Sequence, residues 1–117
     1  MAYNEALADR IIESLVHLDD VVEKKMFGGV CYMVNGKMCM GVIKDELFCR
    51  IDPAMEETVY EMRGCRPMDF AKRPMKGFIY VSEEGMKTKK AFEYWVELAL
   101  AYNAVVEVGK KKKNVRG

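Results

Sequence analysis

Apolar side chains recur at helical spacing near both ends of the chain. The first stripe predicts a helix over residues 4–18, and the second, which is rich in aromatic residues, predicts a helix over residues 88–107. The first stripe consists of Leu7, Ile11, Leu15 and Leu18, broadened by Ala8 and Ile12. The second consists of Phe92, Trp95, Leu98, Ala99, Tyr102 and Val106. Each helix is expected to bury this face, and Trp95 is expected to lie in the core.

Short apolar runs separated by turn signals predict five strands between these helices. They cover residues 21–27, 30–34, 37–43, 47–51 and 78–81. Asn35-Gly36 suits the positive φ angles of a two-residue hairpin turn. Asp52-Pro53 predicts a helix start, and Gly64 its left-handed end. Residues 65–77 contain two prolines and no period, which indicates an irregular crossing segment. The order favours an α+β fold, an antiparallel sheet with helices mainly on one face.

The hairpin turn predicts which side chains share a face of the sheet. With a two-residue loop, Val34 pairs with Lys37, and the next pairs are Met33 with Met38, Tyr32 with Cys39 and Cys31 with Met40. One face then carries Cys31, Met33, Met38, Met40 and Val42, and we expect it to be the core. The other mixes apolar residues with Lys37. Its members Val30, Tyr32, Val34, Cys39 and Ile43 are the candidate partner-binding residues. We expect a homodimer or another protein to cover this face, with Tyr32 as an anchor.

Charge is distributed unevenly along the 117-residue chain. All eighteen acidic residues lie in residues 1–109, which predicts an acidic domain, and residues 110–117 form a basic tail expected to be disordered. An acidic domain is a poor nucleic-acid surface, so contact with a polyanion would be weak or indirect, through the tail. The tail's candidate contacts are Lys110, Lys111, Lys112, Lys113 and Arg116. The basic segment 65–77 could also bind single strands, but a solvated loop is the favoured interpretation.

The four cysteines and the single histidine indicate no catalytic or metal chemistry. The N-terminus has no signal-peptide pattern and no apolar run is long enough for a membrane span, so we expect a cytoplasmic protein with free thiols. His17 should face solvent, and the cysteines lack the paired spacing of a zinc site. The methionines could bind Cu(I), but core packing is favoured. Gly28-Gly29 starts no phosphate loop and is interpreted as a strand entry or a bulge where glycine relieves crowding. We expect no enzyme activity, cofactor or metal.

Five segments in this order resemble the TfoX N-terminal domain family. They are EKKMFGG at 23–29, VNGKMCMGV at 34–42, RPMDF at 66–70, RPMKGFIYV at 73–81 and AFEYWVELALAY at 91–102. The resemblance implies a two-layer α+β domain, similar to the secretion-chaperone-like fold, and kinship with the Sxy-type competence regulators, which act on transcription. Those regulators usually carry a C-terminal domain, so this chain is expected to be a stand-alone member. The resemblance supplies no catalytic residues.

These observations predict a non-enzymatic regulatory domain that works through a protein partner, such as a transcription complex. The alternative is a small-molecule-binding domain or a cryptic enzyme that uses a pocket between sheet and helices. A persistent apolar surface patch would favour the first, and a concave pocket with converging polar groups would favour the second.

Overall fold

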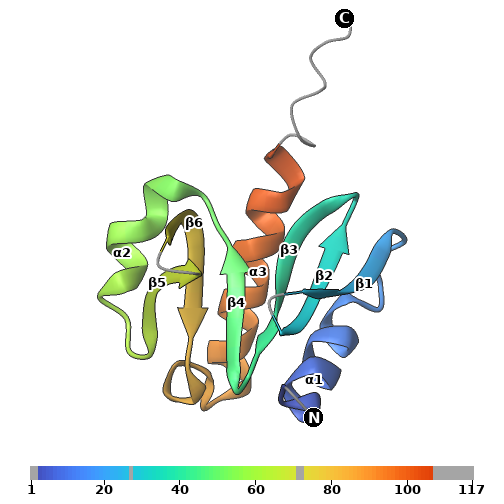
Figure 1. Cartoon of the computed structure of the whole chain (residues 1–117), viewed down its shortest axis with the longest axis horizontal. Coiled ribbons are helices and arrows are strands. Elements are labelled where there is room, and N and C mark those ends of the chain that lie inside the picture. Colours follow the sequence, from blue (N-terminus) through green and yellow to red (C-terminus); the bar gives the residue numbers. More distant parts are fainter. Residues whose placement is uncertain (1–2, 27, 71–72, 107–117) are drawn as a thin grey trace, which may run out of the picture.

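A computed structural model describes residues 3–26, 28–70 and 73–106 of the chain (Figure 1). The helices of this part are α1 (Glu5–Leu15), α2 (Glu56–Tyr60) and α3 (Lys89–Val105), with the 3₁₀ turns η1 (Pro53–Met55) and η2 (Glu83–Met86). The strands are β1 (Val21–Met26), β2 (Gly29–Val34), β3 (Lys37–Ile43), β4 (Glu46–Arg50), β5 (Cys65–Phe70) and β6 (Arg73–Val81).

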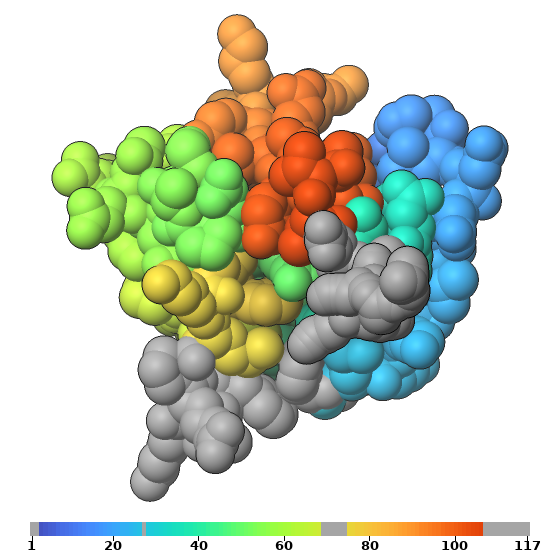
Figure 2. All heavy atoms as spheres, turned by 90° about the horizontal axis from the view of Figure 1, so that it is seen from above, coloured from blue at the N-terminus to red at the C-terminus, as the bar shows by residue number. Residues whose placement is uncertain are grey.

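The strands form one antiparallel sheet in the order β1-β2-β3-β4-β6-β5. α1 and α3 contact each other and pack on the same side of the sheet, behind it in Figure 1. Seen from above, α3 lies between α2, in green, and α1, in blue (Figure 2). The predicted α+β class, with helices mainly on one face of an antiparallel sheet, is therefore confirmed. None of the described helices combines the length and the apolar character that crossing a membrane requires.

Side-chain caps mark the start of the helices. Asn4 and Thr88 cap α1 and α3, because their side chains accept hydrogen bonds from the backbone N–H groups of Leu7 and Ala91, each at 3.0 Å. Asp52 caps the helical segment that Pro53 opens, as predicted. That segment is shorter than expected, since α2 ends at Tyr60. Gly64 keeps a positive φ of 82° but lies in the turn to β5 rather than at the helix end.

The segment predicted to cross irregularly, residues 65–77, forms a strand pair instead. β5 lies at an edge of the sheet, and β6 pairs with both β4 and β5. A proline cannot donate a ladder hydrogen bond, so a sheet tolerates it mainly on edge strands and at bulges. Pro67 lies on an edge strand and also at an irregularity, because the register of β5 shifts between Pro67 and Asp69. The prediction was wrong because it treated the proline as a strand breaker.

The β2–β3 hairpin has the predicted turn but a different register. Asn35 and Gly36 take positive φ angles of 55° and 79°, and Val34 pairs with Lys37 as expected. The register then shifts between Tyr32 and Met33, so that Tyr32 pairs with Met40 rather than with Cys39. The extra residue is a β-bulge, which reverses the faces of all later residues in β3 relative to β2.

The predicted assignment of side chains to the two faces of the sheet was wrong, because of the bulge and because of the side on which the helices pack. The helix side buries the main core cluster, which includes Val30, Tyr32, Val34, Cys39, Met40, Val42, Leu47 and Cys49. Cys31, Met33 and Met38 were predicted to lie in this core and instead belong to a cluster on the opposite side. Only Met40 and Val42 of the predicted core set lie on the helix side.

Two polar contacts attach the end of α3 to the β2–β3 hairpin. The Lys37 ammonium donates to the backbone carbonyls of Asn103 at 2.6 Å and of Val106 at 2.8 Å. The buried side chain of Asn103 donates through Nδ2 to the Val34 carbonyl at 3.0 Å. A cation at a helix C-terminus satisfies the free carbonyls and interacts favourably with the helix dipole. Lys37 therefore has a structural role on the helix side of the sheet.

We expect replacement of Trp95 to destabilise the fold strongly. Trp95 is 1 % exposed, as the stripe predicted, and its Nε1 donates to the Gly85 carbonyl at 2.9 Å. Trp95→Ala should therefore lower the free energy of unfolding by ~3–5 kcal/mol. Trp95→Phe, which keeps an aromatic ring but loses the N–H donor, should cost clearly less. Urea denaturation followed by circular dichroism measures both, and an unchanged midpoint in Trp95→Ala would contradict this placement.

Loss of the Lys37 charge should weaken the attachment of α3. Lys37→Met keeps the length of the side chain but removes both hydrogen bonds, so we expect a loss of about 1–2 kcal/mol in unfolding free energy. Lys90→Met is the matched control, because Lys90 is exposed on the first turn of the same helix. Equal unfolding midpoints for the two variants would show that Lys37 does not hold the helix end.

Candidate functional site

The residues predicted to form a partner surface do not lie together on an exposed face. Val30, Tyr32, Val34 and Cys39 are at most 3 % exposed and lie in the core beneath the helices. Ile43 is separated from them, since it packs in the cluster on the opposite side. The prediction chose the wrong side of the sheet, because it interpreted Lys37 as a sign of solvent. The predicted polyanion contacts of the tail, Lys110 to Lys113 and Arg116, lie outside the described residues.

The opposite side of the sheet carries a second apolar cluster, which we call the methionine face. Its buried members are Cys31, Phe48, Met68 and Tyr80, and its partly buried members are Met26, Met33, Met38, Ile43, Met75 and Phe78. All of these described members come from strands, whereas the helices contribute to the main core. β4, in the middle of the sheet, faces the viewer in Figure 1, with α3 behind it. The described helices therefore do not cover the methionine face, whose central side chains are buried and whose remaining members are partly exposed.

A glycine shapes the centre of the methionine face. Gly41 pairs with Phe48, and a Cβ at position 41 would lie 2.6 Å from Cε2 of the Phe48 ring. The ring therefore occupies the space that a side chain would fill, and Phe48 is fully buried although no described helix covers it. This packing explains a glycine in the middle of a strand, where it otherwise weakens the sheet.

Basic side chains surround the methionine face. Lys24 is exposed on β1 and pairs with Cys31 across the ladder. The guanidinium of Arg50 lies 5.6 Å from the centre of the Phe78 ring, and that of Arg66 lies 4.6 Å from the centre of the Tyr80 ring. Arg66 also forms a bidentate ion pair with Glu46. After this pairing, Lys24 and Arg50 give the described rim a positive charge.

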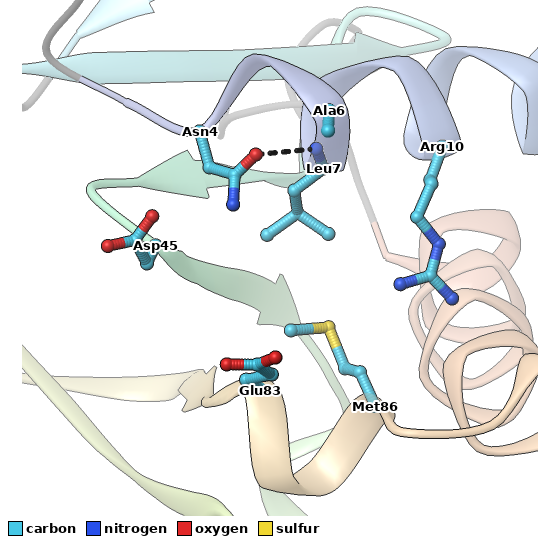
Figure 3. A pocket seen from close by; sticks show the side chains of 7 residues that line it. All are labelled: Asn4, Ala6, Leu7, Arg10, Asp45, Glu83 and Met86. Carbon is cyan, nitrogen blue, oxygen red and sulfur yellow. Dashed lines mark hydrogen bonds between the residues drawn. The ribbon is translucent and has the colours of Figure 1, made fainter.

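A separate polar cavity lies where α1, η2 and the β3–β4 turn meet (Figure 3). It has a volume of about 260 Å³, and Asn4, Ala6, Leu7, Arg10, Asp45, Glu83 and Met86 line it. The side chains of Glu83 and Arg10 extend towards the space between these elements, and Asp45 lies at its margin (Figure 3). Arg10 also stacks on Phe92, with its guanidinium carbon 4.1 Å from the ring centre. The cavity therefore presents one cationic and two anionic groups above an apolar floor.

The four cysteines are free, as the sequence predicted, and all four are buried. Cys31 and Cys39 lie in clusters on opposite sides of the sheet, although each faces the side opposite to its predicted one. Burial raises the pKa of Cys31 to about 11, against smaller opposing effects from the Cys39 backbone and Lys24. Burial also raises the pKa of Cys39 to about 12. Such thiols remain protonated and are poor nucleophiles and metal ligands.

The other candidate residues take ordinary structural positions. His17 is exposed, as predicted. Gly29 starts β2, and a Cβ there would collide with the backbone of Val42, which confirms the interpretation of Gly28-Gly29 as a crowded strand entry. Within the described ranges, no three His, Cys, Asp or Glu side chains gather into a group that could hold a metal ion.

The comparison with protein families assigns the chain to a class. The family described as TfoX N-terminal domain matches residues 13–102. This match covers most of the 117 residues, and the chain belongs to the TfoX N-terminal domain family. Comparison with the curated proteins and with the solved structures gives no match. The family supports a regulatory, competence-associated type of domain and is not a known enzyme family.

The buried thiols predict how stability depends on pH. A cysteine of ordinary pKa 9.0 ionises in the unfolded chain before Cys31 or Cys39 ionises in the native state. The unfolded state therefore binds fewer protons above pH 9, and the free energy of unfolding should fall from about pH 9 towards about pH 12. Urea denaturation across this range measures the fall, which should be shallower in Cys39→Ala. Four thiols should react with a thiol reagent after unfolding, and rapid reaction in the native state would contradict their burial.

Proposed function

We propose that this domain is a non-enzymatic regulatory module that acts by binding another protein through the methionine face. The observation that supports this proposal is the combination of partly exposed methionines and a basic rim on one sheet surface. An apolar surface patch rimmed by polar groups is typical of a protein-binding site. Methionine is common at such sites because its unbranched, polarisable side chain adapts to different apolar partners.

The aromatic residues of this face favour a protein partner over a nucleic acid. Proteins that bind single strands use exposed rings, on which successive bases stack. Here Phe48 is fully buried and Tyr80 is 9 % exposed, so two of the three described rings are packed within the sheet surface and only Phe78 is partly exposed. The partly exposed side chains include Met33 and Met38, which offer aliphatic contact area instead. These are contacts that an apolar protein segment makes.

The rim charges define the chemistry of the partner. Lys24 and Arg50 lie on β1 and β4, on either side of the partly exposed methionines of β2 and β3. A segment that fills the apolar centre and carries Asp or Glu at its borders would complement both features. The proposed partner is therefore an apolar protein segment with acidic flanks, and its binding should weaken as salt concentration rises.

The polar cavity supports a second candidate function, the binding of a small zwitterion. Its single guanidinium, Arg10, could meet a carboxylate, and Asp45 and Glu83 could meet an amine. Both carboxylates are exposed, however, and the volume of about 260 Å³ lies below the usual size of ligand pockets. Titration of free amino acids, followed by amide NMR shifts, tests this candidate: shifts that are confined to the cavity and lost in Arg10→Ala would favour it.

The proposed protein-binding function can be tested with a photo-reactive amino acid placed at Met38 or at Val105. Met38 lies on the methionine face, whereas Val105 is 72 % exposed at the end of α3. In the native cell, position 38 should cross-link to one defined protein, and position 105 should not. The purified partner should bind the wild-type chain and Val105→Lys equally, and Met38→Lys about tenfold more weakly, since a charge disrupts apolar contact at the centre of an interface.

Three outcomes would contradict this proposal. The first is equal cross-linking from positions 38 and 105, which would indicate non-specific proximity. The second is cross-linking from position 38 to nucleic acid alone. The third is a purified partner whose affinity does not change in a folded Met38→Lys chain, with folding checked by circular dichroism.

A further inference from the structure

The two edges of the sheet differ in how they are protected. β5, at one edge, contains Pro67 and contacts α2. β1, at the other edge, contains no proline, and among the described strands it pairs only with β2. An edge strand presents a row of backbone N–H and C=O groups that can pair with another strand. β1 is therefore the edge that is open to extension of the sheet.

Exposed apolar side chains gather beside this open edge. Of the six exposed large apolar residues in the described part of the chain, three lie close to this edge: Ile12 on α1, Val16 directly after α1 and Val22 on β1, which are 44 %, 78 % and 49 % exposed. A groove of about 270 Å³ runs between the two elements, and its lining is largely apolar: Ile12, Leu15, Val16, Leu18, Val21, Glu23 and Tyr32. In Figure 2, α1 and the segment of β1 form one margin of the molecule, in shades of blue.

We propose that β1 pairs antiparallel with β1 of a second copy of this chain, so that two sheets join into one across a two-fold axis. Such an axis is perpendicular to the joined sheet and keeps both sets of helices on the same side. Residues that oppose each other must then come from the same face. Glu23 and Lys25 pair with Tyr32 and Val30 of β2, whose side chains lie in the main core, so both face the helix side. Val22 and Met26 face the other side of the sheet.

The charges of β1 select one register. When the axis passes through Lys24, each Glu23 opposes Lys25 of the other copy, and each Val22 opposes Met26. When the axis passes through Glu23, the two Glu23 carboxylates oppose each other, and no opposite charges meet. Directly opposed pairs of opposite charge or of apolar residues stabilise an antiparallel ladder, and like charges destabilise it. The sequence of β1 is thus complementary to itself about Lys24.

Lysines on an edge strand usually prevent such pairing, so Lys24 and Lys25 need an explanation. In the proposed register, Lys25 is matched by Glu23, and only the central pair of Lys24 side chains is alike. Lys24 is exposed, and its long side chain can direct the ammonium into water. The joined sheet also brings Ile12 and Val16 of both copies to one side of the junction, where they can cover each other. Two-fold dimers of this kind are the commonest assemblies of soluble chains.

Charge reversal tests the proposed dimer and its register together. Sedimentation equilibrium at micromolar concentration should show a wild-type dimer. Glu23→Lys and Lys25→Glu should each raise the dissociation constant about tenfold, because each single change opposes like charges twice across the axis. The double variant Glu23→Lys with Lys25→Glu restores opposite charges and should return the dissociation constant to the wild-type value. Only a ladder in which these two positions oppose each other predicts this recovery.

A second pair of variants tests the apolar patch. Val16→Asp should abolish the dimer, whereas Val105→Asp, at a similarly exposed position on α3, should leave it intact. Circular dichroism confirms that each variant is folded. A monomeric wild-type chain, a double reversal that is no better than the singles, or an equal effect of both aspartates would overturn the proposal. Val16 and Met38 lie on different sides of the sheet, so failure of the dimer leaves the test of partner binding independent.

Discussion

One extra residue in β3 determines which side chains of the sheet face the helices and which face the opposite side. The bulge in the β2–β3 ladder places Met40 and Val42 towards the helices, together with Tyr32. β4 pairs with β3 beyond the bulge, so Leu47 and Cys49 follow them into the core, and β6 continues the pattern with Ile79 and Val81. The same shift leaves Gly41 beneath the Phe48 ring on the methionine face. Both the core and the candidate interaction surface therefore depend on this irregularity.

Local signals in the sequence were sufficient for the elements of the fold but not for the faces of the sheet. The helix start at Asp52-Pro53, the Asn35-Gly36 turn and the stripe around Trp95 act within a few residues, and the structure confirms them. The choice of face was wrong in β2 because Val30 to Val34 are apolar at every position, so alternation has no polar side to indicate solvent. A regular ladder was also assumed, and a one-residue slip reverses every later side chain.

The candidate site was missed for a related physical reason. Lys37 marked its face as solvent-exposed in the sequence, yet its charge is satisfied by the last carbonyls of α3. Half of the methionine face comes from β4, β5 and β6, and only the pairing of these strands brings its residues together. These residues are Phe48, Met68, Met75, Phe78 and Tyr80. That pairing joins segments far apart in the sequence. The number of methionines was the available signal, and it indicated adaptable packing without locating it.

The late position of α3 in the chain has a consequence for synthesis. Asn103 bonds to the carbonyl of a residue 69 positions earlier, and Trp95 and Phe92 cover a sheet whose first four strands end at Arg50. While the chain is being made from its N-terminus, those strands emerge long before the helix that buries them. The nascent chain therefore passes through a stage in which α1 alone of the two long helices can cover the helix side of its sheet, and this stage is the one that aggregation and chaperones can reach. A ribosome stalled before residue 89 would hold a chain whose sheet lacks α3.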